Sequence, residues 1–132
     1  MKEYNLDYFS RTGWSFIFLK KDKIVYRSKG RGLQPLLFCL KNKREDLKGA
    51  TVYDKVVGRA AALLLVHGKV KKIMTPSITG DALARLKEKN IQVDFGFLAK
   101  IILNAKGNGP CPMEILSKGK NAGELFRILT GK

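Results

Sequence analysis

The longest uninterrupted apolar run of the chain, residues 60–66, is only seven residues long and lies between two glycines. A membrane-spanning helix needs roughly 20 apolar residues, so this run excludes a membrane span and predicts a helix buried in a globular core. Thr51 and Asp54 have the spacing of a capping box, with Asp in place of Glu. Residues 56, 60, 63, 64 and 67 follow at helical spacing. The sequence therefore predicts a helix whose first turn contains Asp54 and which Gly68 ends.

The other segments alternate between β-like and helical patterns. Two β-rich runs at 15–19 and 24–27, separated by a polar turn, predict an antiparallel hairpin. The same reasoning predicts strands at 71–75, stopped by Pro76, and at 91–95, and helices over 2–11, 33–40, 82–89, 97–103, 111–114 and 121–129. A hairpin followed by a β-α-β unit indicates an α/β fold, namely a three-layer α/β/α sandwich with a mixed sheet. A length of 132 residues fits a single domain over 1–132.

Positive charge is the main bias in composition. Lys and Arg number 26 against 11 Asp and Glu, so the formal net charge is +15. Such a charge attracts phosphate and predicts weak, non-specific binding to nucleic acid at low salt. Because the charge is spread along the whole chain, specific recognition of nucleic acid is an alternative rather than the first hypothesis. Lysines near the hairpin edge at 23–27 argue against pairing of that edge with a second copy.

Histidine and cysteine are scarce in the chain. One histidine, His67, and two distant cysteines, Cys39 and Cys111, do not make a usual four-ligand zinc site. We therefore predict no metal and no cofactor. Cys39 falls in an apolar helical segment and is predicted to be a core residue. The lack of an apolar signal segment near the start, together with unpaired cysteines, predicts a reduced, cytoplasmic setting.

Two predicted helix starts, at 54–59 and 109–114, carry the side chains best suited to bind or react with a small molecule. Unpaired N–H groups at a helix start attract anions. The same field favours a Cys111 thiolate, for which Glu114 is a candidate proton acceptor. The alternative is that Glu114 caps its helix and Cys111 packs inside. For Asp54 and Lys55, the alternative is a cap and its surface ion pair.

Residues 53–62 together with 109–114 resemble a small prokaryotic family that is described as a domain of unknown function. The resemblance spans nearly the whole chain. It implies a fold similar to that of the cytidine deaminases, in which helical layers enclose a mixed sheet with an antiparallel hairpin at one side. This implied fold agrees with the order of elements predicted from the sequence.

The zinc motifs of deaminases are missing from the matching positions. A deaminase needs a His or Cys, one residue and a Glu at one helix start, and Pro-Cys-x-x-Cys at the next. The resemblance places Val56 at the ligand position and Gly58 at the Glu position. Ser77 and Gly80 replace the two cysteines that follow Pro76. Without the metal and the acid–base group, water is not activated, so zinc-dependent deamination is disfavoured.

The resemblance therefore favours a ligand pocket at the corresponding end of the sheet. Gly58 in place of Glu opens space there, and completion of the pocket requires Cys111 to lie within reach of Asp54 or Lys55. The predicted ligand-binding residues are Asp54, Lys55, Gly58, Arg59, Cys111 and Glu114. The first hypothesis is a protein that binds a small anionic or nucleotide-like ligand. The alternatives are a basic nucleic-acid-binding protein and a cysteine-dependent enzyme that uses Cys111. In such an enzyme Glu114 or Asp54 is the proton acceptor and Lys55 stabilises charge.

Overall fold

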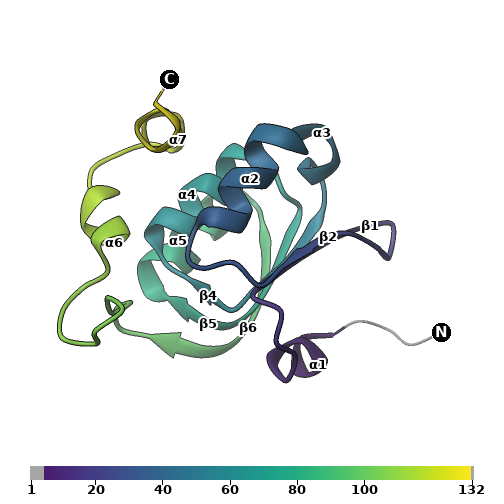
Figure 1. Cartoon of the computed structure of the whole chain (residues 1–132), viewed down its shortest axis with the longest axis horizontal. Coiled ribbons are helices and arrows are strands. Elements are labelled where there is room, and N and C mark those ends of the chain that lie inside the picture. The colour runs from purple at the N-terminus through teal and green to yellow at the C-terminus, as the bar shows by residue number, and fades with distance from the viewer. Residues whose placement is uncertain (1–4, 132) are drawn as a thin grey trace.

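A six-stranded mixed sheet forms the centre of the computed structural model, which describes residues 5–131 (Figure 1). The strands are β1 (Phe16–Lys20), β2 (Lys23–Ser28), β3 (Thr51–Asp54), β4 (Val56–Val57), β5 (Lys72–Thr79) and β6 (Gln92–Ala99). β1 lies antiparallel between β2 and β3. β3 and the short β4 pair in turn with one side of β5, and β6 pairs with the other side, all in parallel. The predicted mixed sheet and its hairpin are confirmed.

Helices cover the two faces of the sheet unequally. They are α1 (Leu6–Ser10), α2 (Gln34–Asn42), α3 (Arg44–Leu47), α4 (Arg59–His67), α5 (Gly80–Glu88), α6 (Pro112–Leu116) and α7 (Ala122–Thr130). α4 packs against α2, α5, α6 and α7 on one face, over a core that includes Phe18 and Ile73. On the opposite face, Phe9 of α1 packs with Tyr53 and Met74. Residues 2–4 of the predicted first helix lie outside the described residues.

The parallel strands bring their carboxyl ends to one edge of the sheet. α4 connects β4 to β5, and α5 connects β5 to β6, and the two helices pack against each other. Both helices therefore begin at the edge where the parallel strands end (Figure 1). Ligands of open α/β sheets bind at the carboxyl ends of the strands, so the fold itself marks this edge as the place for a site.

The helix predicted from Thr51 onwards is wrong in its first part. Thr51–Asp54 form β3, Val56–Val57 form β4, and α4 begins only at Arg59, with Gly58 as its N-cap. β-Branched and aromatic residues that lie between two neighbouring strands favour extended backbone. This pairing with β1 and β5 outweighs the capping-box spacing. The predicted end of the helix is confirmed, because α4 stops at His67.

Two predicted boundaries in β5 and β6 are also wrong. β5 continues through Pro76, which lies between the segment paired with β3 and the segment paired with β4. The missing N–H of proline therefore interrupts neither of these ladders. β6 continues along β5 to Ala99, so no helix begins at Phe97.

The prediction that Cys39 is a core residue is confirmed, and caps define the starts of two of the helices. Cys39 is fully buried in α2, and Thr79 caps α5 by accepting a hydrogen bond from the backbone of Ala82. Asn121 and Glu124 form a capping box at the start of α7. Among the helices described between residues 5 and 131, none has the length and apolar character needed to cross a membrane.

Candidate functional site

Glu114 of α6 caps the N-terminus of α4. Its Oε1 accepts a hydrogen bond from the Arg59 N–H at 2.8 Å, and its Oε2 accepts one from the Ala60 N–H at 3.0 Å. The N-cap residue itself, Gly58, has no side chain that can accept these bonds. A carboxylate at a helix N-terminus is stabilised by such hydrogen bonds and by the helix dipole. A distant part of the chain thus supplies the cap that the local sequence lacks.

Gly58 leaves the room that the Glu114 carboxylate occupies. A Cβ atom at this position would overlap Oε1 of Glu114 and Cδ1 of Ile102. The backbone of Gly58 is extended, with φ −109°, a conformation open to any residue. Space, and not backbone conformation, therefore requires glycine here. The predicted opening at the helix start exists, but a carboxylate of the same chain fills it.

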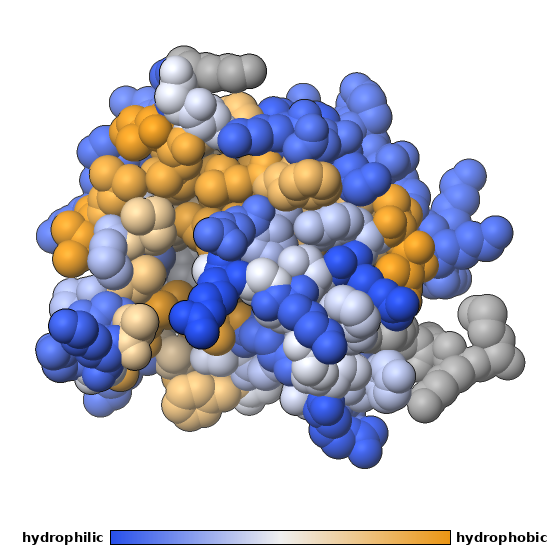
Figure 2. Space-filling model, viewed as in Figure 1, coloured by the Kyte–Doolittle hydropathy of each residue, from blue (hydrophilic) through white to orange (hydrophobic). Residues whose placement is uncertain are grey.

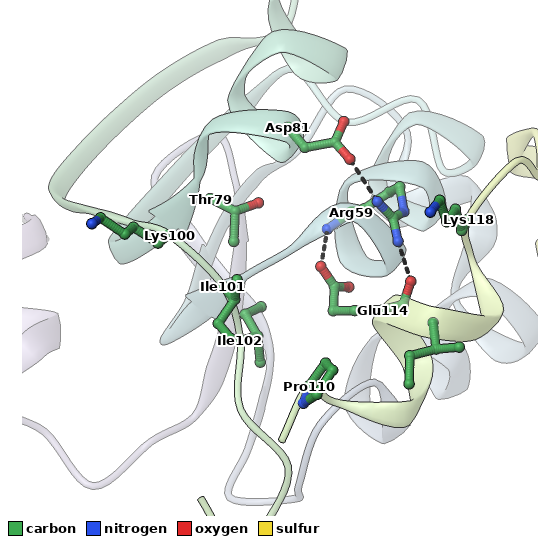
Figure 3. A pocket seen from close by; sticks show the side chains of 10 residues that line it. Arg59, Thr79, Asp81, Lys100, Ile101, Ile102, Pro110, Glu114 and Lys118 are labelled. Atoms are coloured by element: carbon green, nitrogen blue, oxygen red, sulfur yellow. Dashed lines mark hydrogen bonds and ion pairs between the residues drawn. The ribbon is translucent and has the colours of Figure 1, made fainter. Parts of the chain in front are cut away.

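The Arg59 side chain joins three segments of the fold. Nη1 donates to Oδ2 of Asp81 in the first turn of α5 at 2.8 Å, and Nε donates to Oγ of Ser117 at 3.1 Å. Nη2 donates to the carbonyl oxygen of Glu114. The Arg59 side chain is 18% exposed and Ser117 is fully buried. The rigid fork of guanidinium donors thus fixes the starts of α4 and α5 against α6 (Figure 3).

A cavity of about 340 Å³ lies beside this network. Ten residues line it: Arg59, Thr79, Asp81, Lys100, Ile101, Ile102, Pro110, Glu114, Ile115 and Lys118. Thr79 ends β5, and residues 100–102 directly follow β6, so the cavity lies at the carboxyl ends of the parallel strands (Figure 3). Its volume is near the lower end of the roughly 300–1,000 Å³ range of small-molecule sites.

The carboxylates around the cavity have partners within the protein, whereas two ammonium groups beside it have none among the described residues. Asp81 accepts hydrogen bonds from Arg59 and Arg85, each at 2.8 Å. Burial alone would raise the pKa of Asp81, but these two hydrogen bonds outweigh it and hold the pKa below its ordinary value. Glu114 is held by the α4 backbone. By contrast, no hydrogen bond or ion pair joins the ammonium groups of Lys100 or Lys118 to any other residue in the described range 5–131.

The structure brings three of the six predicted ligand-binding residues together: Gly58, Arg59 and Glu114. Lys55 is engaged elsewhere. Its ammonium donates to the carbonyl oxygen of Thr12 at 2.7 Å and lies 5.0 Å from the centre of the Phe9 ring, on the face of the sheet that α1 covers. The alternative of a surface ion pair between Asp54 and Lys55 is also wrong, because the Lys55 ammonium donates instead to the carbonyl oxygens of Ser10 and Thr12.

Cys111 lies directly before α6 and does not line the cavity. It is half-buried, its backbone N–H donates to the carbonyl oxygen of Ile102 at 2.8 Å, and its thiol makes no capping hydrogen bond with the helix. The predicted start of α6 is confirmed, since Cys111 is the N-cap and Pro112 opens the helix. The backbone of Cys111 therefore holds the start of α6, which carries Glu114, against the segment after β6.

Asp54 is buried at the end of β3, outside the cavity lining. Burial raises its pKa well above the ordinary value, and hydrogen bonds from the backbone N–H groups of Lys55 and Val56 only partly oppose this effect. The folded state thus holds the Asp54 proton more tightly than the unfolded chain does. Stability must fall as the pH rises from the ordinary pKa of 3.8 through the raised one.

Replacing Asp54 with asparagine is expected to remove this pH dependence, because Asn keeps the oxygen acceptor and never ionises. The D54N variant should exceed the wild type in free energy of unfolding at pH 8, by on the order of 1 kcal/mol, and lose this advantage near pH 4. Urea unfolding across that range measures the difference. An advantage that is constant with pH, or a less stable variant at pH 8, would contradict the assignment.

The positions that match the deaminase zinc motifs bring no metal ligands together. Val56 in β4 and Gly58 before α4 carry no donor side chain, and Gly80 opens α5. Ser77 lies within β5 and not at the helix start. Among residues 5–131, no three His, Cys, Asp or Glu side chains cluster as a metal site would require. The residues present therefore do not fit the zinc ion of a deaminase.

Sequence reasoning missed most of the cavity lining, including Asp81 and Lys118, and also missed Ser117, which accepts a hydrogen bond from Arg59. Asp81 and Arg85 form an i,i+4 ion pair that looks like any surface pair on a helix. Ser117 and Lys118 follow a short apolar segment and belong to no motif. Only the packing of α6 against the start of α4 shows their role, and no local pattern encodes that contact.

Comparisons with known proteins identify a family and solved structures of similar fold. A family model described as TM1506, domain of unknown function (DUF1893), matches residues 5–132. The solved structure of a DUF1893 family protein, TM1506 from Thermotoga maritima, is 28% identical in sequence, with a TM-score of 0.84, and the match covers 96% of this chain and 85% of that one. RibD from Acinetobacter baumannii is 22% identical, with a TM-score of 0.51, over 88% of this chain and 33% of RibD. No curated protein matches the chain.

The fold is an α/β fold similar to that of RibD, and the positions matched to the zinc ligands of deaminases carry Val56, Ser77 and Gly80. The likeness to RibD shows the fold alone, since the matched part is a third of RibD and the identity is low. The chain belongs to the DUF1893 family, whose model matches nearly all of it. The predicted membership of a family of unknown function is thereby confirmed.

Proposed function

We propose that the protein binds a small anionic ligand in the cavity at the starts of α4 and α5. The observation that carries this proposal is the charge balance of the cavity. Its two carboxylates, Asp81 and Glu114, are satisfied by groups of the protein itself, whereas the ammonium groups of Lys100 and Lys118 have no partner among the described residues. A carboxylate or phosphate group of a ligand supplies the acceptor that such an ammonium lacks.

The lining of the cavity indicates which small anions it suits. Ile101, Ile102 and Ile115 supply apolar surface to the lining, which suits a ring or short chain attached to the anionic group. Nucleoside monophosphates and aromatic carboxylates have this chemistry. Figure 3 shows Lys118 on the same side as Arg59, while Lys100 lies on the opposite side and extends away. We therefore assign Lys118 as the anchor of the anion.

Thermal unfolding with a panel of anions tests the proposal. The panel contains inorganic phosphate, nucleoside monophosphates and aromatic carboxylates, each compared with sodium chloride at the same ionic strength. A ligand at 100 times its Kd should raise the free energy of unfolding by about 2.7 kcal/mol. Because the protein carries a charge of +15, the chloride reference separates binding from general screening.

Replacing Lys118 with alanine should raise the Kd of the best ligand at least tenfold. The matched control is Lys89→Ala, which removes the same charge from an exposed position at the end of α5, outside the cavity lining. Its Kd should equal that of the wild type. The proposal fails if no anion stabilises the protein more than chloride does, or if the two lysine variants bind alike.

The two other functions predicted from the sequence have less support. Binding of nucleic acid rests on the net charge alone, and retention of RNA or DNA above physiological salt would be needed to favour it. A cysteine-dependent reaction requires Cys111 beside a bound substrate, but Cys111 is not among the residues that line the cavity. Binding of a small anion is therefore the function that the geometry supports best.

A further inference from the structure

β6 is an edge strand, and its outer side pairs with no segment in the described part of the chain. The other edge strand, β2, exposes Lys23 and Arg27. Charged residues, lysine above all, prevent edge strands from pairing with other chains. Within Gln92–Ala99 the only charged residue is Asp94. The two edges of the sheet therefore differ, since β2 exposes two basic residues and β6 carries a single carboxylate and no lysine.

Large apolar side chains are exposed along β6 and the segment that follows it. Five of the ten large hydrophobic residues exposed in the described structure fall within 95–103. They are Phe95, Phe97, Leu98, Ile101 and Leu103, and Phe97 is 66% exposed. Figure 2 shows apolar side chains at the lower left of the molecule, where β6 and the following segment lie in Figure 1. A clustered apolar edge of this kind is typical of a surface that pairs with another chain.

We propose that β6 pairs antiparallel with β6 of a second copy, about a two-fold axis at Phe97. The register follows from charge. In this register Asp94 of one copy lies opposite Lys100 of the other, which directly follows β6, and the two-fold symmetry forms this ion pair twice. Phe95 lies opposite Ala99, and the two Phe97 side chains lie opposite each other.

Charge also favours a second copy at this edge in particular. Two molecules that each carry +15 repel each other over most of their surfaces. Gln92–Ala99 contains one carboxylate and no basic residue, so β6 is a place where two copies can approach. Asp94 is itself half exposed and has a 3.5 Å contact with Lys72, a surface ion pair of little strength that leaves it available to a second lysine.

The dimer goes beyond the proposed ligand binding and does not depend on it. Lys100 borders the cavity but extends away from Arg59 in Figure 3, and the dimer gives it a partner. The anchor assigned to the anion is Lys118. Failure of either proposal therefore leaves the other in place, because ligand affinity and oligomeric state are measured separately.

Sedimentation velocity over a range of protein concentrations tests the dimer. The wild type should shift from monomer to dimer, and Phe97→Lys should raise the dimer Kd at least tenfold. Since Phe97 is 66% exposed, this variant is expected to fold, and circular dichroism checks that it does. The matched control is Ile24→Lys, which places the same charge on the other edge strand at an apolar residue 42% exposed. It should leave the dimer Kd unchanged.

A charge swap then tests the register. Asp94→Lys and Lys100→Asp should each raise the dimer Kd several-fold, and the double variant D94K/K100D should restore it toward the wild-type value. A wild type that stays monomeric at millimolar concentration overturns the proposal. So does an Ile24→Lys variant that weakens the dimer as much as Phe97→Lys does, or a double variant that dimerises no better than the single ones.

Discussion

Replacing Arg59 with methionine is expected to lower the free energy of unfolding by about 3 kcal/mol, because it removes charge-assisted hydrogen bonds and a donor to a buried hydroxyl. Methionine keeps the apolar stem but none of the donors. Asp81 then keeps only Arg85, and the buried Ser117 hydroxyl loses the donor at 3.1 Å. Urea unfolding at pH 7 measures the loss. Arg59→Lys should recover only part of it, because one ammonium does not reproduce the guanidinium fork.

The matched control for Arg59 is Arg85→Met, which removes the other partner of the same carboxylate. That side chain is 38% exposed, so its loss should cost less than about 1 kcal/mol. The pH dependence of the stability cost provides a second test. Hydrogen bonds from both arginines hold the pKa of Asp81 below 3.8, so the stability that Asp81 contributes is present above that pH and is lost as the pH falls through the lowered pKa. The cost of Arg59→Met should therefore shrink in acid. Equal costs for the two variants would contradict the central role given to Arg59.

Replacing Glu114 with alanine is expected to cost about 2–3 kcal/mol, the range for hydrogen bonds to a charged group and an N-terminal cap. The variant leaves the N–H groups of Arg59 and Ala60 without their acceptors, and α6 loses its attachment to α4. Glu114→Gln keeps one oxygen acceptor and should cost less. Hydrogen exchange should quicken most at the amides of residues 59 and 60. The exposed Glu88→Ala in α5 removes the same charge and should change neither stability nor exchange.

Gly58→Ala provides an independent check of the same contact. The added methyl overlaps the Glu114 carboxylate and Ile102, and overpacking of this kind typically costs about 1–3 kcal/mol. In the Glu114→Ala background the methyl has more room. The sum of the stability costs of the two single variants should therefore exceed the stability cost of the double variant. Simple additivity, or unchanged amide exchange at residues 59 and 60 in Glu114→Ala, would show that Glu114 does not hold the start of α4.

Much of the fold is encoded in local pattern. The turn between β1 and β2, Thr79 before α5 and the capping box of Asn121 each specify an element through neighbouring residues. The wrong predictions arise where pairing with distant strands decides the structure. Thr51–Asp54 has the spacing of a helix start, but its position between β1 and β5 makes it a strand. Pro76 stops an isolated strand, yet here it falls between the two ladders of β5.

The site is harder to predict than the fold because its contacts join distant segments. Gly58 and Glu114 stood out in the sequence, but for different reasons from the one that the structure shows. Gly58 was expected to admit a ligand, and it admits the Glu114 carboxylate. Lys55 is next to the site in sequence but contacts the α1 side of the sheet. Lys118 belongs to no motif and reaches the cavity only because Arg59 and Glu114 fix α6 beside α4.

The position of a bound anion is the most direct test of the account. Two-dimensional ¹H–¹⁵N NMR of the labelled protein, titrated with a nucleoside monophosphate against sodium chloride at equal ionic strength, locates it residue by residue. Saturable shifts should concentrate at the amides of Arg59, Ile101, Ile102 and Lys118, which line the cavity. Shifts spread over lysines across the whole surface, with no saturation and no cluster at these four amides, would mean that the cavity is not an anion site.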